Sequence, residues 1–476
     1  MEVKLSGRRA RPRDVARKLG IGLGLLLLAL APGLYVDGYF RVLATAGFVG
    51  LAILGVRTLA ATILTGRRPV DPPAKPDGIE WPTVSVLIVA YNEAAVLPRT
   101  MAAMEHVRYP RDRIEFVYVY EKRSTDATAA IIRSFAERDA RIVPVERNDK
   151  RGGKAAACNF GLDHCTGEIL VSLDADHALK PDAIERAVRW FLSDPNIACV
   201  KGRPMAVNAT ESTLALCTTL ERDVVERGET YFREVVGGFT FFGGGQAFFR
   251  RSLFEQIGRF DEEVLIEDID FSVRIHQAGY RLVVDPFVIS HEEHPANWSA
   301  WWAQRTRWTR GGMQLVERYL PHLSTMNRAP LGMRADLFYN LAFSLLPVVL
   351  LMTLPFVIMP FLGIHVRTFF PQAVETFGGI FFAAMPTVAW IGMWWHDRRD
   401  GVKHAAVEWL AVPLLWPYLV LQGAVFASAF LDEFVLRTKP VYVKTSKTGA
   451  EPALPAAPAV APVRAESILE EAMPWK

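Results

Sequence analysis

The chain has 476 residues, which is long for one domain and predicts two or three structural units. Hydrophobic residues make up 51% of it and the mean hydropathy is +0.15, high for a soluble protein and low for one buried wholly in a membrane. The formal net charge of +3 does not indicate binding of a nucleic acid polymer.

Two apolar runs open the chain, at residues 20–36 and 42–64. The second is long enough to cross a bilayer, and the first lies near the lower limit of about 17 residues. A cleaved signal peptide is disfavoured for the first run, because no small-residue cleavage site stands out and the second run follows at once. The basic residues ahead of both runs predict that this end faces the cytoplasm, so residues 1–66 form a two-helix membrane unit. The residues are Lys4, Arg8, Arg9, Arg11, Arg13, Arg17 and Lys18.

A proline-rich linker at 67–82 leads into a soluble α/β pattern at 83–320. Five apolar runs in this unit predict buried strands, and 127–137 predicts a helix between two of them. The predicted strands are Val84–Ala90, Ile114–Tyr120, Ile142–Val145, Ile169–Leu173 and Ile197–Val200. Strands that alternate with helices predict a mainly parallel sheet covered on both faces. The four cysteines show no metal-ligand spacing and no pairing pattern, which predicts reduced, buried thiols.

The C-terminal part, 321–431, contains three further apolar runs, at 335–363, 377–395 and 405–431. Basic residues before and after the last run place both of its flanks on the inside. We therefore expect four full spans and one non-crossing element at 405–431. A basic segment, 432–449, follows, and the Ala- and Pro-rich tail at 450–476 is expected to be disordered.

The strand at 169–173 is followed by two carboxylates, Asp174 and Asp176. Ligands collect at the carboxyl ends of strands in α/β sheets, and residues i and i+2 point to the same side. The pair therefore suits a divalent cation that also holds a diphosphate. The alternative is an ordinary solvated turn.

The first strand ends in Tyr91, Asn92 and Glu93, which could hold a nucleoside. The alternative is that Asn92 caps the following helix. Residues 150–159 place two glycines before Lys154 at a predicted helix start, which favours anions but lacks the spacing of an ATP-binding loop.

Three further motifs follow in the same unit. The glycines of 243–250 let the backbone approach a ligand, or form a flexible turn. Glu267 and Asp268 begin a predicted helix, where the helix dipole alone would favour acids, but an aspartate there could also deprotonate a hydroxyl. A Trp-rich segment, Trp298–Trp308, would fit a membrane interface as well as a site.

In this order the motifs resemble those of membrane-integrated family 2 glycosyltransferases, the group of hyaluronan, chitin and cellulose synthases and ceramide glucosyltransferases. The resemblance spans residues 84–312 and implies an α/β GT-A (nucleotide-diphospho-sugar transferase) domain flanked by transmembrane α-helices. It implies that Asp174 and Asp176 hold Mg²⁺ or Mn²⁺ on the donor diphosphate, and that Asp268 activates the acceptor.

The resemblance also implies roles for the remaining motif residues. Gln304, Arg307 and Trp308 match a Gln-x-x-Arg-Trp motif in which Arg307 neutralises the diphosphate and Trp308 stacks on the acceptor sugar. Nucleotide contacts are expected from Tyr91, Glu93, Glu121 and Lys154, and Gly244 and Gly245 are expected to line the acceptor pocket. Lys122 departs from the family pattern, in which an acidic residue stands there, and this leaves the expected UDP donor open.

Tyr442–Lys447 is similar to the gating loop of cellulose synthases, with one residue displaced. Thr445 and Lys447 are then the expected diphosphate contacts. Such a loop has to lie in the cytosol, which agrees with a non-crossing 405–431.

The resemblance implies an inverting glycosyltransferase of the cytoplasmic membrane, with its catalytic domain in the cytoplasm. The expected substrate pair is a nucleotide-sugar, UDP-linked by preference, and a growing polysaccharide. The alternatives are transfer to a membrane lipid, or a non-catalytic protein that binds sugar nucleotides. The protein's expected partners are the bilayer and either a second copy of the chain or accessory export subunits.

Overall fold

The computed structural model describes residues 2–4, 12–149, 153–348, 366–439, 441–445 and 447–449. Residues 150–152 of the glycine–lysine motif, residues 349–363 of the third apolar run and the tail predicted to be disordered lie outside the described residues.

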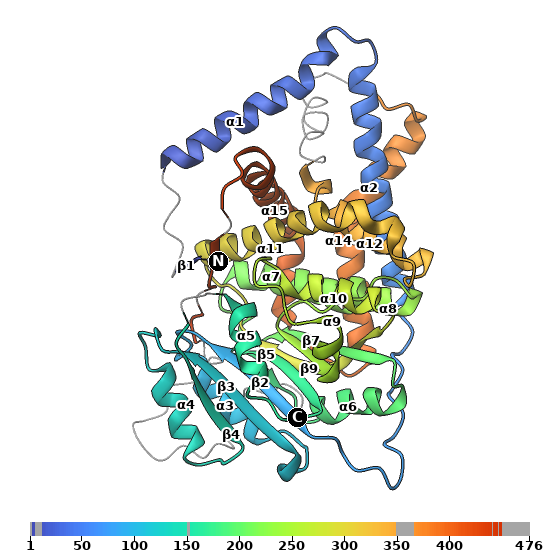
Figure 1. Ribbon diagram of the computed structural model, residues 1–476. Coiled ribbons are helices and arrows are strands. Elements are labelled where there is room, and N and C mark those ends of the chain that lie inside the picture. Colours follow the sequence, from blue (N-terminus) through green and yellow to red (C-terminus); the bar gives the residue numbers. More distant parts are fainter. Residues whose placement is uncertain are drawn as a thin grey trace.

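One large mixed sheet organises the catalytic part, with the strand order β4-β3-β2-β5-β8-β7-β9-β6 (Figure 1). Its strands are β2 (Val84–Ala90), β3 (Ile114–Glu121), β4 (Ile142–Arg147), β5 (Ile169–Asp174), β6 (Ala178–Leu179), β7 (Ile197–Ala206), β8 (Gln246–Arg250) and β9 (Arg281–Glu292). All five predicted strands are present, because each is an apolar run that ends at polar residues. A separate two-stranded parallel pairing joins β1 (Glu2–Lys4) to β10 (Val441–Val443).

The predicted mainly parallel arrangement is broken only at β8 and β6, since β7 and β9 also pair in parallel. The strands β4, β3, β2 and β5 are parallel neighbours, whereas β8 runs antiparallel to both β5 and β7. Strands β6, β8 and β9 of this sheet were not predicted. β8 is five residues long and directly follows a glycine-rich loop, which masks a strand pattern in the sequence.

Helices cover both faces of the sheet, as the alternating pattern predicts. The helices α3 (Leu97–Glu105), α4 (Thr128–Ala136) and α6 (Ala183–Ser193) pack on one face, around Val86 and Ile88. The helices α5 (Lys154–Leu162), α9 (Ser252–Ile257) and α10 (Glu267–Gln277) pack on the other, around Leu87 and Leu170. All four cysteines are free and buried, as predicted.

A helical layer joins the sheet to the membrane-associated part. It contains α7 (Thr213–Asp223), the π-helix η3 (Val224–Thr230), α8 (Tyr231–Val236), α11 (Trp298–Tyr319) and α12 (Leu331–Phe343). Short 3₁₀ segments lie at η1 (Ala31–Leu34), η2 (Arg111–Arg113) and η4 (Leu320–Thr325).

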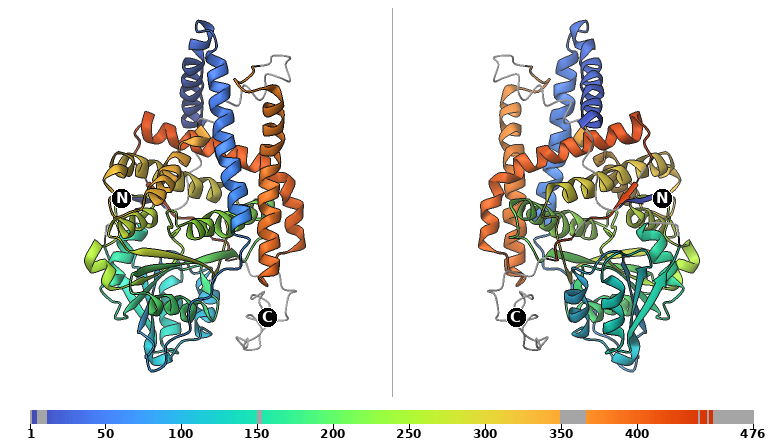
Figure 2. Two further views of the ribbon diagram at one scale, coloured as in Figure 1. Left: turned by 90° about the vertical axis from the view of Figure 1, so that its right-hand side faces the viewer. Right: turned by 90° about the vertical axis from the view of Figure 1, so that its left-hand side faces the viewer.

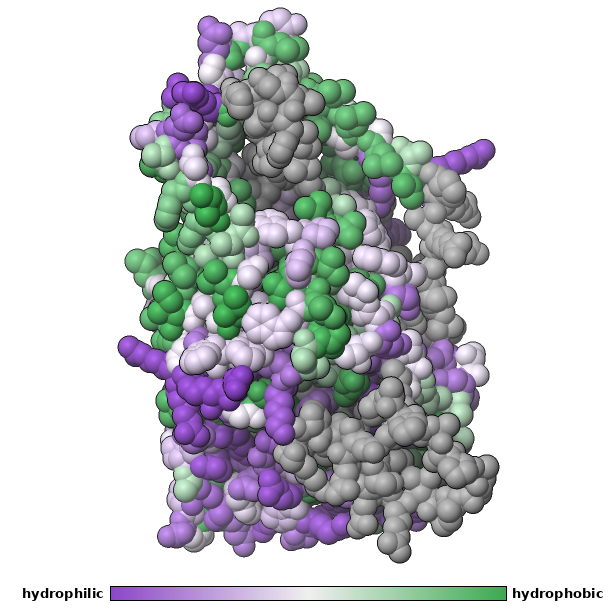
Figure 3. Space-filling model, turned by 180° about the vertical axis from the view of Figure 1, so that it is seen from behind, coloured by the Kyte–Doolittle hydropathy of each residue, from purple (hydrophilic) through white to green (hydrophobic). Residues whose placement is uncertain are grey.

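Among the described residues, four helical segments are long and apolar enough to cross a membrane: 13–34, 39–64, 372–399 and 406–435. They comprise α1 (Pro12–Leu30), α2 (Tyr39–Leu64), α14 (Gln372–Arg399), and the run of η6 (Ala406–Leu414), α15 (Leu415–Phe430) and η7 (Leu431–Val435). Figure 2 shows α15 lengthwise, lying across α2 and α14 instead of alongside them. Seen from behind, apolar residues gather over the helical part and hydrophilic residues over the sheet domain (Figure 3).

Candidate active site

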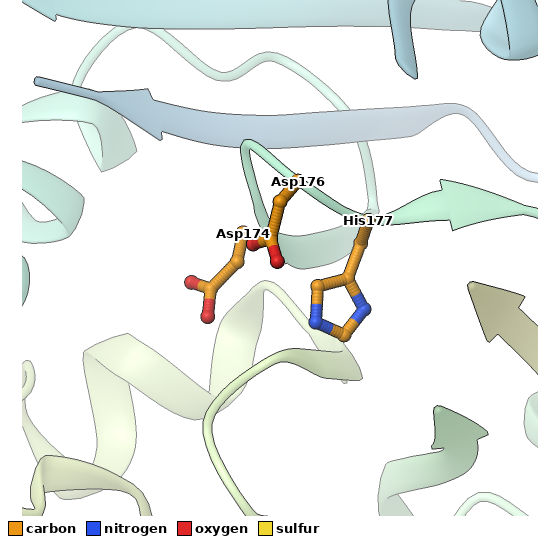
Figure 4. A group of neighbouring side chains, drawn as sticks. All are labelled: Asp174, Asp176 and His177. Carbon is orange, nitrogen blue, oxygen red and sulfur yellow. The ribbon is translucent and has the colours of Figure 1, made fainter. Parts of the chain in front are cut away.

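The carboxylate pair lies where the sequence predicts it, at the end of β5 in the middle of the sheet. Asp174 is the last residue of β5 and is paired in register with Val89 of β2. Asp176 and His177 follow in the turn to β6, and one ligand atom from each of the three residues lies within 4.8 Å of the others. Figure 4 shows the three side chains projecting from this turn.

Two lysines neutralise the carboxylate pair. Lys154, the first residue of α5, pairs with Asp174 and donates a hydrogen bond of 2.5 Å to the Gly244 carbonyl. Lys447, from the C-terminal segment, lies 2.5 Å from Asp176 Oδ2 and donates to the Glu293 carbonyl at 2.8 Å. Burial alone would raise the pKa of Asp176, but the Lys447 and His177 charges bring it below its usual value.

The residues of this turn fit a hard divalent cation through their carboxylates. Both ring nitrogens of His177 are already occupied, Nδ1 by Ser290 Oγ at 2.9 Å and Nε2 by Glu292 Oε2 at 3.1 Å. Oxygen ligands are those that Mg²⁺ and Mn²⁺ prefer. Asp174 and Asp176 would therefore bind the cation, while His177 positions the turn.

The ends of β2 and β3 form the side of the pocket predicted to bind the nucleoside. Arg123 lies over the Tyr91 ring, 5.1 Å from its centroid. Glu121 Oε1 forms an ion pair with the buried Arg147, and Glu121 Oε2 lies 3.4 Å from Arg123 Nε. Lys122 is 59% exposed and points toward Glu146, away from this side, so the unusual residue does not enter the pocket.

Glu93 and Asn92 at the end of β2 have distinct environments. Lys444 pairs with Glu93 at 2.9 Å, and burial raises the pKa of Glu93 to about 7 although the lysine opposes this. The alternative of Asn92 as a helix cap is wrong, because α3 begins at Leu97. Asn92 instead adopts a left-handed backbone and accepts a hydrogen bond from the Thr125 N–H at 2.7 Å.

Asp268 lies in the first turn of α10, where acidic side chains match the positive end of the helix dipole. Gly244 (φ +80°) lies against it: a Cβ on this glycine would come within 2.9 Å of Asp268 Oδ2. Burial, with the charge of the adjacent Glu267, raises the pKa of Asp268 to about 7 against the opposing charges of Lys154 and Arg307. Asp268 is thus a half-buried carboxylate whose pKa is raised toward neutrality, which suits a general base.

The Gln-x-x-Arg-Trp motif lies in α11 and faces the same pocket. Gln304, Arg307 and Trp308 all line it. Two guanidinium groups contact the Trp308 ring, with Arg305 at 4.8 Å and Arg222 at 5.5 Å from the centroid.

The structure brings together every residue that the sequence analysis selected for the site. The residues that line one pocket are Tyr91, Glu93, Glu121, Lys154, Asp174, Asp176, Gly244, Gly245, Asp268, Gln304, Arg307, Trp308, Thr445 and Lys447. Elements far apart in the sequence meet there because the carboxyl ends of β2, β3 and β5 face α10, α11 and the segment after β10.

Sequence reasoning missed several lining residues: Arg123, Thr218, Arg222, Glu292, Glu293, His294 and Lys444. A signal existed for one group, since 291–294 reads His-Glu-Glu-His at the end of an apolar run. Glu293 holds the C-terminal segment by accepting hydrogen bonds from the Thr448 and Gly449 N–H groups at 2.5 and 3.1 Å. Only the folded chain shows this contact, because it joins residues 155 positions apart.

Comparison with known families places this pocket in context. The model of the family described as glycosyl transferase family group 2 matches residues 169–420, more than half of the chain, so the protein belongs to that family. The matched region contains the end of β5, Asp268 and the α11 motif.

Three curated relatives are similar over the same part of the chain. A probable glycosyltransferase, YdaM, of Bacillus subtilis is 30% identical over 55% of this chain and 62% of its own. The β-monoglucosyldiacylglycerol synthase of Synechocystis is 29% identical over 60% of each chain. The poly-β-1,6-N-acetyl-D-glucosamine synthase of Staphylococcus epidermidis is 28% identical over 51% of this chain and 58% of its own. The chain thus spans about three fifths of the length of these relatives.

The fold agrees with that of a solved structure. The mannosyltransferase PcManGT from Pyrobaculum calidifontis, solved in complex with GDP-Man and Mn²⁺, has a TM-score of 0.51 and 21% identity, with 84% of this chain and 99% of that one covered. The sheet with its covering helices is the GT-A fold, as predicted.

Proposed function

We propose that this protein is an inverting membrane glycosyltransferase that moves a sugar from a nucleotide-sugar to an acceptor hydroxyl. The observation that carries the proposal is the pocket itself, which two carboxylates fit for a cation line together with a half-buried carboxylate, Asp268, whose pKa is raised to about 7. The two kinds of carboxylate suit the two tasks of the reaction, binding of the diphosphate and removal of a proton.

In the proposed reaction, Asp268 takes the proton of the acceptor hydroxyl as its oxygen attacks the anomeric carbon. The bond from that carbon to the diphosphate oxygen breaks, and its electron pair leaves with the nucleoside diphosphate. Arg307, Lys154 and Lys447 place positive charge around the diphosphate. A divalent cation held by Asp174 and Asp176 would neutralise the same leaving group.

The nucleoside would lie between Tyr91, Glu121 and Arg123. Glu121 already pairs with Arg147 through one oxygen, so its second oxygen is the one positioned to accept an N–H from a base. Uracil offers one such N–H, at N3, flanked by two carbonyls that Arg123 can meet. This arrangement favours a UDP-linked donor and leaves the sugar to experiment.

We propose a growing polysaccharide as the acceptor. The C-terminal segment supports this, because it reaches from the membrane-associated helices into the donor side of the pocket through Lys444, Thr445 and Lys447. The crosswise α15 supports a run at 405–431 that does not cross the bilayer, which keeps this segment with the catalytic domain in the cytoplasm. The proposed units remain residues 1–66, 67–82, 83–320, 321–431, 432–449 and 450–476.

Transfer to a membrane lipid is the second candidate. The similarity to a β-monoglucosyldiacylglycerol synthase favours it, at an identity and coverage comparable to those of the polysaccharide synthase.

The test is product formation by the purified full chain in nanodiscs. UDP-GlcNAc, UDP-Glc and GDP-Man are each supplied with Mg²⁺ or Mn²⁺, beside an Asp268→Asn control. A polymer that grows without primer and is absent from the control supports the polysaccharide proposal. A single sugar moved to added lipid supports the second candidate. Turnover of no donor would contradict both.

A further inference from the structure

A second group of buried metal-ligating side chains lies outside the pocket, at the junction between the catalytic domain and the membrane-associated helices. Asp223 ends α7, His404 lies in the loop after α14, and Glu408 lies in the first turn of η6. One ligand atom from each residue lies within 4.8 Å of the others. His404 Nδ1 is 3.0 Å from Glu408 Oε2 and 3.8 Å from Asp223 Oδ2.

The far side of each ligand is held by a separate partner. His404 Nε2 contacts Asp397 Oδ2 at 2.8 Å. Arg203 donates two hydrogen bonds of 2.7 Å to the same carboxylate. The Ala405 N–H donates to Glu408 Oε1 at 2.9 Å. A carboxylate on the far nitrogen is the usual outer partner of a metal-bound histidine, because it fixes the ring and the tautomer. Asp223 Oδ2, His404 Nδ1 and Glu408 Oε2 are not used by these partners and lie close to one another.

The Asp223 side chain faces the same point from the catalytic domain. This side chain is only 3% exposed. Arg203 donates to its Oδ1 at 3.3 Å, whereas Oδ2 accepts no hydrogen bond from the described residues and is directed at His404. A cation at this point would be shared by Asp223 Oδ2, Glu408 Oε2 and His404 Nδ1.

Negative charge also exceeds the positive charge dedicated to this junction. Asp223, Asp397 and Glu408 are three carboxylates in contact with Arg203 or His404. A fourth carboxylate, Asp400, adjoins this group: Arg227 lies 2.9 Å from Asp400 and 3.5 Å from Asp397, and Arg399 lies 2.8 Å from Asp400. Four carboxylates therefore face three guanidinium groups, and one further positive charge, from a bound cation or from a proton on His404, balances the junction.

We propose that Asp223, His404 and Glu408 bind one divalent transition-metal ion, with Zn²⁺ as the preferred ion. One imidazole nitrogen and two carboxylate oxygens form a donor set that suits Zn²⁺. The three ligands come from the catalytic domain and from the turn between α14 and η6. The ion would therefore tie the membrane-associated helices to the sheet domain. The proposal is independent of the sugar and the acceptor.

The rival occupant is a proton on His404, which would let both ring nitrogens donate to carboxylates. The experiment separates the two by measuring bound metal. The full chain with Asp174→Asn and Asp176→Asn, which removes the carboxylates of the pocket, is purified in detergent and incubated with ZnCl₂. It is then dialysed against metal-free buffer, and its zinc content is measured by mass spectrometry. We expect about one retained zinc per chain and a Tm that rises with added ZnCl₂.

Adding His404→Gln to this background should abolish both the retained zinc and the Zn²⁺-dependent rise in Tm. Glu408→Gln, which keeps the size of the side chain, is the second variant in case His404→Gln does not fold. His396→Gln is the matched control: His396 lies nearby on α14 and contacts the Thr62 carbonyl instead of this cluster. A background protein that retains no zinc, with a Tm unaffected by ZnCl₂, would overturn the proposal in favour of the proton.

Discussion

The two kinds of carboxylate that line the pocket differ in their electrostatic environment. Asp174 and Asp176 each pair with a lysine, Lys154 and Lys447. Asp268, by contrast, has no cation within ion-pair distance among the described residues and lies beside a second acid, Glu267. The pKa of Asp176 falls below its usual value, whereas that of Asp268 rises to about 7.

This difference shows how one pocket can serve two functions with the same chemical group. A carboxylate surrounded by positive charge stays ionised and is ready to share a cation with a diphosphate. A buried carboxylate beside another acid holds its proton more tightly and becomes a useful base at neutral pH. Substitutions at Asp268, at Asp176 and at the turn that carries Asp176 test the two environments separately.

The largest effect is expected from Asp268→Asn. The variant lacks the proton acceptor but keeps the size of the side chain, so kcat should fall by about 10²–10⁴-fold while donor affinity stays near that of the wild type. Steady-state transfer and donor binding by calorimetry measure the two quantities. Asp270→Asn is the control on the same helix: Asp270 is held by Arg274, Arg318 and Tyr319, outside the pocket, so its loss should lower Tm but not kcat.

The same variant should be more stable than the wild type at alkaline pH. The pKa of Asp268 is higher in the folded protein than the usual value of about 3.9 in an unfolded chain, so the folded state binds more protons. Stability is therefore lost as pH rises from about 4 to 7, by at most about 4 kcal/mol. Asparagine carries no such charge. The Tm advantage of Asp268→Asn should be present at pH 8 and shrink at pH 5; an advantage equal at both values would contradict the contrast.

Asp176→Asn tests the opposite side of the pocket. It removes a carboxylate that would bind the cation and leaves Lys447 without its partner. Donor affinity in the presence of Mn²⁺ should weaken by about 100-fold, or roughly 2.7 kcal/mol. Calorimetric titration with the donor, with and without Mn²⁺, measures this loss. Donor affinity that remains Mn²⁺-dependent and unchanged would show that the cation lies elsewhere.

Gly245→Ala should disturb the turn that carries the pair. A Cβ at this position would come within 2.4 Å of His177 Nε2, in a buried site where His177 is held by Ser290 and Glu292. Overpacking of this kind costs about 1–3 kcal/mol, visible as a lower Tm. Gly243→Ala is the matched control, since nothing lies within 4 Å of its added Cβ. Equal Tm values for the two variants would count against this account of the turn.

The sequence predicted those parts of the structure that depend on local pattern. Apolar runs such as Val84–Ala90 become strands wherever both faces are buried, and the polar residues at their carboxyl ends must then face the same edge of the sheet. This is why Asp174 and Glu93 could be assigned to one site from the pattern, whereas Glu121 was assigned to it by the family resemblance. The start of α10 was predictable too, because Glu267 and Asp268 precede an amphipathic run.

What the sequence could not predict depends on tertiary contact. Nothing local to Lys444 indicates that it pairs with Glu93, and nothing local to Lys122 indicates that it points away from the pocket. The short β8 was missed because Gly243–Gly245 precede it and five residues carry too little pattern. The raised pKa of Asp268 likewise follows from its loss of solvent in the pocket, together with the charge of Glu267, and only the fold produces the first of these.

The measurement that tests the central contrast most directly is the pH dependence of kcat/KM for the wild type, between pH 5 and 9. The base must be ionised to act, so kcat/KM should fall about tenfold per pH unit below a pKa of about 7. Glu267→Gln removes the negative charge beside Asp268 and should therefore move the fall in kcat/KM to lower pH. Two results would contradict the assignment of Asp268 as the base: a wild-type kcat/KM that does not change down to pH 5, or a fall in kcat/KM that stays at the same pH in Glu267→Gln.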